Sequence, residues 1–161
     1  MTFRTATSIS HVELQSLHLS RFTPDLKRKQ ILAQLERWLD EHPETGFLHS
    51  HIAAIVADAI RFRNGREYDL LAFCVMPNHV HMLFTLKSGM NLAAVMRKLK
   101  SYTATQINQA LKKGGPVWQR EYFDRLVRPG TLGRFVNYIV QNPRRALLTG
   151  WAFAEDCRPP S

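Results

Sequence analysis

The hydrophobic and polar positions of this chain form two contrasting runs near its centre. Residues 70–76 are almost continuously apolar, which is typical of a central strand buried on both faces. Residues 79–86 alternate instead, and successive side chains of a strand point to opposite faces of a sheet. A Pro-Asn turn at residues 77–78 separates the two runs. The pattern predicts two adjacent strands, with His79 and His81 on the same face of the second.

Apolar residues at helical spacing predict four helices. The first begins at Pro24, with Thr23 as its N-cap, and stops near Pro43. The other three helices are expected over about residues 50–64, 91–112 and 132–147.

Two further segments have the composition of strands. Residues 1–7 predict a short first strand, followed by a polar loop up to Ser20. Residues 117–128 are rich in aromatic and β-branched side chains and predict a strand at the edge of the sheet. No repeat or linker divides the chain, and its length suffices for one substantial core. We therefore expect a single domain over residues 1–161, of which 150–161 form a tail.

The charge of the chain points to an anionic partner. A formal net charge of +9 attracts polyanions, so nucleic acid is the leading expectation. The apolar runs are shorter than the roughly 20 residues that a membrane span needs, and we expect no signal peptide and no membrane partner. The two cysteines are Cys74, in a predicted buried strand, and Cys157, in the tail. This placement argues against a disulfide and fits a reducing cytoplasm.

The histidines at positions 79 and 81 are the first candidates for chemistry. Their Cβ atoms should lie roughly 7 Å apart on one strand face, so the two rings can converge on one cation or one phosphate. The signal is weak alone, because His49 and His51 repeat the spacing at the start of a predicted helix, where residues two apart face different directions. We interpret the second pair as unrelated to a site. For the first pair, a structural or surface role is the alternative.

The last predicted helix carries a polar stripe. Arg134, Tyr138 and Asn142 lie at i, i+4 and i+8, so a tyrosine and an amide project together. Pro143 follows directly and disfavours a helical conformation at the residue before it. We expect the helix to kink or end at Asn142.

Three motifs together resemble a known family. They are MPNHVHMLF at 76–84, WQREYFDRLVR at 118–128 and VNYIVQNP at 136–143. They occur in the order found in the single-tyrosine HUH transposases and, within these, in the REP-associated tyrosine transposases. The resemblance covers most of the chain between residues 65 and 150 and is specific because all three motifs occur together.

The resemblance implies a role for each of four residues. His79 and His81 would be the metal-binding histidine pair, Asn142 the third protein ligand and Tyr138 the nucleophile. Mixed nitrogen and oxygen ligation of this kind suits Mg²⁺ or Mn²⁺ in use, and Zn²⁺ or Ni²⁺ could occupy the site in a preparation. The implied activity is that of a metal-dependent endonuclease and strand transferase for single-stranded DNA. It would act through a 5′-phosphotyrosine intermediate and release a free 3′-hydroxyl.

The resemblance also implies the fold and the partners. The fold class is α+β, with a ferredoxin-like antiparallel sheet of four or five strands. Helices would cover the face carrying Val80, Met82 and Phe84, and the catalytic helix would cross the histidine face. The expected partner is single-stranded or hairpin DNA, and the subfamily implies palindromic sequences of the REP type. The protein would be a monomer or a homodimer in the bacterial cytoplasm, associated with the nucleoid.

Basic residues expected near DNA phosphates are chosen by their positions along the chain. They are Arg97, Lys98, Lys100, Arg120, Arg125, Arg128, Arg134, Arg144 and Arg145. Tyr102 is both a candidate base-stacking contact and the main rival nucleophile, although it falls on the apolar stripe of its helix. Tyr122 is a weaker rival, because no amide accompanies it.

Two other functions remain open at this point. One is a domesticated hairpin-binding protein that keeps the fold but does not cleave DNA, and the intact set of two histidines, tyrosine and asparagine argues against it. The other is a metal-dependent nuclease that hydrolyses DNA with water and forms no covalent intermediate.

Overall fold

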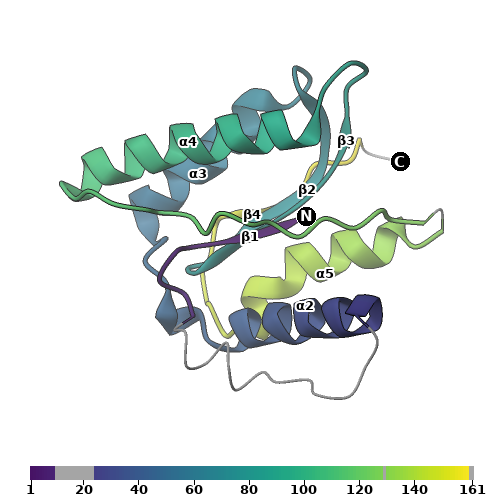
Figure 1. The fold of residues 1–161 in the computed structure, drawn as a ribbon, viewed down its shortest axis with the longest axis horizontal. Helices are drawn as coiled ribbons and strands as arrows, with labels where there is room; N and C mark the ends of the chain where they lie inside the picture. The colour runs from purple at the N-terminus through teal and green to yellow at the C-terminus, as the bar shows by residue number, and fades with distance from the viewer. Residues whose placement is uncertain (10–23, 129, 160–161) are drawn as a thin grey trace.

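The structure, a computed structural model, describes residues 1–9, 24–128 and 130–159. Its strands are β1 (Thr2–Arg4), β2 (Tyr68–Val75), β3 (His79–Leu86) and β4 (Ala154–Asp156). Its helices are α2 (Pro24–Glu41), the short 3-10 helix η1 (Pro43–Thr45), α3 (Ser50–Arg63), α4 (Leu92–Leu111) and α5 (Leu132–Arg145). The strands form one antiparallel sheet in the order β1-β3-β2-β4. Helices α3 and α4 lie on one side of this sheet, and α2 and α5 lie on the other (Figure 1).

The two central strands follow the predicted pattern. β2 and β3 pair antiparallel around the turn, with Cys74 opposite His81 and Phe73 opposite Met82. Val80 and Met82 belong to the main hydrophobic core, together with residues of α3 and α4. The histidines therefore face the opposite side of the sheet, as predicted from the alternation.

Helices α3 and α4 form the layer over this core. Each has an apolar stripe, and the stripes bury Ile52, Val56 and Ile60 of α3 and Val95 and Leu99 of α4. The backbone N–H of Ala94 donates to the side chain of Asn91, the N-cap of α4, and left-handed Lys112 ends that helix. Both helices have the bounds that the sequence predicts to within two residues.

Helix α5 crosses the histidine face of the sheet. Val136 and Ile139 pack against Ala72 and Cys74 of β2, so the opposite stripe of the helix remains available for polar contacts. The helix does not end at Asn142, since α5 continues through Pro143 to Arg145. Proline costs the helix one hydrogen bond, and both Asn142 and Pro143 are buried in the last turn of α5.

Two segments near the sheet edges differ from the sequence prediction. The stretch 117–128 lies beside β1, but it pairs only through isolated bridges, from Thr2 to Phe123 and from Thr5 to Trp118. It is therefore an irregular edge segment and not a strand. The predicted tail instead contains β4, which pairs with β2. The polar loop expected up to Ser20 lies beyond residue 9, outside the described residues.

Helix α2 lies on the same side as α5, a position that the sequence did not predict. Leu35 and Leu39 of α2 form a small separate core with Ile9, and Phe123 packs against it. In the described part of the chain, no helix is long and apolar enough to span a bilayer.

Candidate metal centre and active site

Three side chains converge on the face of the sheet that α5 crosses. The Nε2 atoms of His79 and His81 on β3 lie 2.9 Å apart, and both residues are buried. Oδ1 of Asp40, near the end of α2, lies 3.1 Å from Nε2 of His79 and 3.4 Å from Nε2 of His81. Among the described residues, Asp40, His79 and His81 are the group of His, Cys, Asp and Glu side chains whose ligand atoms are close enough to hold a metal ion.

Asn78 determines which ring nitrogen of His79 carries the proton. The buried Asn78 amide donates from Nδ2 to the carbonyl oxygens of Leu39 and His42, at 3.0 and 2.8 Å. Its Oδ1 is therefore the acceptor for Nδ1 of His79, 2.6 Å away. A proton on Nδ1 leaves the lone pair of Nε2 directed at the site, which is how proteins commonly prepare a histidine ligand. The same amide ties the end of α2 to the turn before β3.

A second hydrogen-bond chain does the same for His81. The hydroxyl of Thr2 donates to Oε1 of Glu36 at 2.7 Å, so its oxygen accepts from Nδ1 of His81 at 2.9 Å. Nε2 of His81 then also presents a lone pair to the site. Thr2 is paired with His81 across β1 and β3, so the sheet itself sets this contact.

The donor set fits a cation. Two imidazole lone pairs and one carboxylate oxygen lie within 3.4 Å of one another, an arrangement that repels unless positive charge lies between them. Burial opposes ionisation of Asp40, but the hydrogen bonds that Tyr138 and Asn142 donate to it favour the carboxylate form. Burial, reinforced by His81, lowers the pKa of His79 to about 4, so its ring is neutral at neutral pH. Neutral imidazoles and an ionised carboxylate are the forms that bind metals.

Tyr138 on α5 joins the same carboxylate. Its Oη donates to Oδ2 of Asp40 at 2.5 Å, and its ring lies edge-on to His81 at 5.5 Å between centroids. Burial, and then the negative charge of Asp40, raise the pKa of Tyr138 well above its usual value. The guanidinium of Arg145 lies 5.4 Å above the tyrosine ring and favours the phenolate. The phenol thus needs further positive charge to ionise at neutral pH.

Asn142, one turn beyond Tyr138, completes the cluster. Its Nδ2 donates to Oδ1 of Asp40 at 2.7 Å. Its Oδ1 is buried and lacks a hydrogen-bond donor among the described residues. An orphaned buried oxygen costs free energy, and a cation ligated by that oxygen would remove the cost. The residues present therefore fit a divalent metal.

Asp40 is the site residue that sequence reasoning missed. It lies about 40 positions before the histidines, and no motif of the chain includes it. Only the packing of α2 beside α5 brings its carboxylate to the site (Figure 1). A carboxylate directly after an apolar helical stripe was the available signal, and such a residue is usually solvated.

The candidate DNA-contacting residues divide between the two sides of the sheet. Arg125 and Arg134 line the same cleft as Asp40 and Tyr138, and Arg145 lines a second cleft beside them. Arg128 lines a pocket next to the first cleft, and Arg120 and Arg144 are exposed. On the far side of the sheet, α4 carries Arg97, Lys98, Lys100 and Tyr102.

The α4 residues therefore do not join the metal centre. The ammonium of Lys100 bonds the carbonyl oxygens of Gln119 and Arg120, so it anchors the edge segment. Tyr102 is half-exposed under the guanidinium of Arg63, and no site residue lies beside it in the described structure. Tyr122 packs against the main core.

Comparison with known proteins assigns the family. A family model described as "Transposase IS200 like" matches residues 46–142, which include both histidines, Tyr138 and Asn142. The chain belongs to the IS200-like transposases. The matched stretch of this transposase begins after Asp40, so the carboxylate lies outside it.

This IS200-like transposase has relatives of the kind that its motifs predict. A protein of Haemophilus influenzae named as a REP-associated tyrosine transposase is 26% identical over 87 residues, or 47% of this chain and 49% of the relative. The chain thus spans about half the length of that curated relative. A solved structure of a REP-associated tyrosine transposase bound to a REP hairpin matches with a TM-score of 0.55 and 22% identity, over 68% of this chain and 67% of that chain. The predicted α+β fold of this family is confirmed.

Proposed function

We propose that this transposase is a metal-dependent endonuclease and strand transferase for single-stranded DNA, which cleaves hairpin or palindromic sequences through a covalent tyrosine intermediate. The observation that carries the proposal is the convergence of a candidate metal centre and a tyrosine on one carboxylate. Asp40 contacts Nε2 of both His79 and His81 through Oδ1 and accepts the phenol of Tyr138 through Oδ2.

His79, His81 and Asp40 would hold the metal, with Oδ1 of Asn142 as a fourth ligand atom. Nitrogen and oxygen ligands of this kind suit Mg²⁺ or Mn²⁺ in use. A divalent cation there supplies Lewis-acid polarisation of the scissile phosphate and offsets the charge that develops in an in-line displacement. Asn78 and Thr2 keep the two imidazoles in the tautomer that ligation needs.

Tyr138 would be the nucleophile. Asp40 orients its Oη, and the phenol proton points at Oδ2 of that carboxylate. Attack of Oη on phosphorus forms a tyrosine O–P bond and breaks the bond from phosphorus to the 3′ oxygen, while the phenol proton passes to Oδ2 of Asp40. The DNA is left with a 5′-phosphotyrosine end and a 3′-hydroxyl that takes up a proton. One phosphodiester replaces another, so a 3′-hydroxyl can reverse the step and rejoin strands.

Charge and fold favour DNA as the substrate. Arg125, Arg134 and Arg145 line the clefts on either side of Tyr138, where the phosphates of a bound strand would lie. A hairpin substrate is proposed because the solved relative with this fold was bound to a REP hairpin.

The test is covalent capture of DNA. The protein is incubated with Mn²⁺ and a panel of labelled DNA hairpins with single-stranded flanks, and the products are analysed by denaturing gel and mass spectrometry. We expect a 5′-linked adduct on Tyr138 that disappears in Tyr138→Phe. Tyr102→Phe is the matched control, because it removes a tyrosine hydroxyl on the far side of the sheet. This variant should still form the adduct.

Other outcomes would replace the proposal. Cleavage without an adduct, retained in Tyr138→Phe, would identify a nuclease that uses water. Tight hairpin binding with neither cleavage nor adduct would identify a protein that only binds DNA.

A further inference from the structure

The pocket that Arg128 lines adjoins the candidate active site and lies at the outer edge of β3. It has a volume of about 540 Å³ and is lined mainly by apolar side chains, among them Leu83, Phe84 and Leu86 of β3. The edge segment supplies the other wall, with Leu126 and Val127, and the first residue of α5 contributes Leu132. This size is within the range of roughly 300–1,000 Å³ that is typical of ligand pockets.

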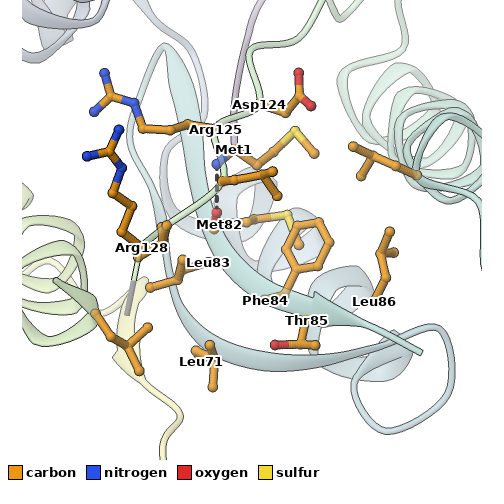
Figure 2. Close-up of a pocket in the computed structure, with 14 residues that line it drawn as sticks. Met1, Leu71, Met82, Leu83, Phe84, Thr85, Leu86, Asp124, Arg125 and Arg128 are labelled. Carbon is orange, nitrogen blue, oxygen red and sulfur yellow. Dashed lines mark hydrogen bonds between the residues drawn. The ribbon is translucent and has the colours of Figure 1, made fainter. Parts of the chain in front are cut away.

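Two arginines are among the residues that line this pocket. The side chains of Arg125 and Arg128 extend to the same side of it, while Asp124 extends in another direction (Figure 2). Both arginines are exposed, so their guanidinium groups are available to an anionic ligand. An apolar lining with cationic groups to one side suits a ligand that has flat apolar faces and a negatively charged backbone, which describes a nucleotide within a strand.

Arg125 connects the pocket with the candidate active site. It lines this pocket and also the cleft that contains Asp40 and Tyr138. Its guanidinium lies 5.9 Å from the ring centroid of Phe135, which lines that cleft as well. The two hollows are therefore neighbours, and one strand can follow Arg125 from one to the other.

The edge of β3 offers hydrogen-bonding groups to such a ligand. β1 covers this edge only as far as Met82, whose backbone N–H and C=O bond to Met1. Every second residue of an antiparallel strand directs its backbone N–H and C=O to the same edge. The N–H and C=O of Phe84, two residues after Met82, therefore point toward the pocket. In the described part of the chain no strand pairs with that stretch of β3 on this edge. Backbone donors and acceptors there can meet the edge of a base.

We propose that this pocket receives one unpaired base of the DNA strand, next to the phosphate that Tyr138 attacks. Arg125 and Arg128 hold the phosphates beside that base, and the apolar walls enclose its faces. This inference rests on the proposed function, since it assumes that single-stranded DNA is the substrate. It adds a position at which the enzyme senses the presence of a base and not only the charge of the backbone.

The test measures binding separately from cleavage. Tyr138→Phe protein is titrated with a fluorescein-labelled DNA hairpin that carries a short single-stranded flank, and each flank nucleotide in turn is replaced by an abasic one. We expect one position at which loss of the base weakens binding about fivefold to hundredfold, the effect of one stacked base. The other flank positions should change less, because an abasic nucleotide keeps its phosphate.

Variants of residues that line the pocket test whether the sensitive nucleotide of the DNA binds there. Leu126 is 97% exposed, so Leu126→Ser should fold normally, and thermal unfolding checks this. It should weaken binding of the intact hairpin and leave binding of the hairpin abasic at the sensitive position unchanged. Met90→Ser is the matched control, since Met90 is an exposed apolar residue outside the pocket. Arg125→Gln and Arg128→Gln should weaken binding of the intact and of the abasic hairpin by similar factors. Arg120→Gln, on the same segment, should change neither affinity.

The results that would contradict the base pocket lead to different conclusions. Firm hairpin binding with no position-specific loss would overturn the base pocket and leave the proposed function standing. A lack of both binding and adduct with every hairpin would overturn the proposed function and this inference with it. A free protein that sediments as a dimer, and that Leu126→Ser converts to a monomer, would show that the pocket holds a second copy of the chain.

Discussion

Asp40 is the residue on which the other site residues depend most. Its two oxygens contact two imidazoles, a phenol and an amide that come from β3 and α5. Together with burial, the negative charge of this carboxylate opposes ionisation of Tyr138. We infer that the same carboxylate would be a ligand of a bound cation.

Replacement of Asp40 by Asn tests this dual role. Asp40→Asn keeps the shape of the side chain but removes its charge, so we expect Mn²⁺ affinity to fall by at least about tenfold. Isothermal titration calorimetry with Mn²⁺ measures the effect. Glu44→Gln, which neutralises an exposed carboxylate of η1, should leave the affinity unchanged. Equal Mn²⁺ affinity in both variants would exclude Asp40 as a ligand.

Asn78 affects both stability and metal binding. Asn78→Ala removes the donors to Leu39 and His42 and the acceptor for His79, all at a fully buried position. We expect the free energy of unfolding in metal-free buffer to fall by about 2–4 kcal/mol, as measured by urea denaturation. Mn²⁺ affinity should fall about tenfold to hundredfold as well.

A second asparagine provides the control for that variant. Asn108 donates one exposed hydrogen bond to the carbonyl oxygen of Gly115, so Asn108→Ala should cost less than about 1 kcal/mol. It should not change Mn²⁺ affinity. A similar loss of stability in both variants would mean that Asn78 does not anchor α2.

At the residue scale, the sequence predicts what local periodicity controls. The shared face of His79 and His81 follows from strand alternation, and the shared stripe of Tyr138 and Asn142 follows from helical spacing. The contacts of Asp40 and the Thr2–His81 hydrogen bond join residues separated by tens of positions. No local pattern contains such information, because tertiary packing creates it.

At the scale of elements, the connection from α2 to α3 depends on a close approach of two loops. A Cβ on Gly46 would lie 2.0 Å from the carbonyl oxygen of Pro77, in the turn before β3. The backbone N–H of Leu48 also bonds to that carbonyl oxygen at 2.9 Å. Only glycine leaves room for this contact, which places the end of α2 against the histidine strand.

Gly46→Ala should therefore be destabilising. The new methyl group would overlap backbone atoms, and we expect the free energy of unfolding to fall by about 1–3 kcal/mol, as for overpacked cores. Urea denaturation measures this change. Gly133→Ala is the matched control, because Gly133 lies within α5 and its Cβ would meet no atom within 4 Å. Alanine should stabilise that helix by about 0.5–1 kcal/mol. Equal effects of the two substitutions would contradict the steric argument.

The sequence predicts elements well where their ends carry specific signals. Pro24 starts α2 and Asn91 caps α4, as expected from their residue types. β4 has the sequence Ala-Glu-Asp, which lacks strand propensity, and it forms because it pairs with the free edge of β2. The segment 117–128 has strand propensity but faces only three residues of β1, so its pairing stays incomplete.

At the scale of the whole molecule, the basic residues occupy both sides of the sheet, and only one side contains the candidate active site. Binding of DNA on that side should depend on salt, because neutralised phosphates release counterions. For single strands, the slope of log affinity against log salt changes by about 0.7 for each phosphate contact.

Salt titrations of arginine variants identify the side that DNA occupies. Arg134→Gln should reduce the slope by about 0.7, since Arg134 lines the cleft beside Tyr138. Arg97→Gln removes the same charge from α4, on the opposite side of the sheet, and should leave the slope unchanged. Fluorescence anisotropy with a hairpin at several salt concentrations measures both slopes. A reversed result would place the DNA over α3 and α4.

The fold class was predictable because the resemblance implied an antiparallel α+β sheet and the hydrophobic pattern indicated its faces. The side of the sheet on which α2 lies was not predictable, because its apolar stripe fits either layer. That placement brings Asp40 to the site and is the main feature that only the structure reveals.

The position of Asp40 has a consequence for damaged gene copies. A chain that lost its first 41 residues would keep both histidines, Tyr138 and Asn142, and would still contain the whole stretch that matches the family. It would lack the carboxylate that unites them and the threonine that orients His81. Such a remnant would pass a motif search as an intact transposase. We therefore expect the presence of Asp40, and not the motifs alone, to separate active copies from inactive ones.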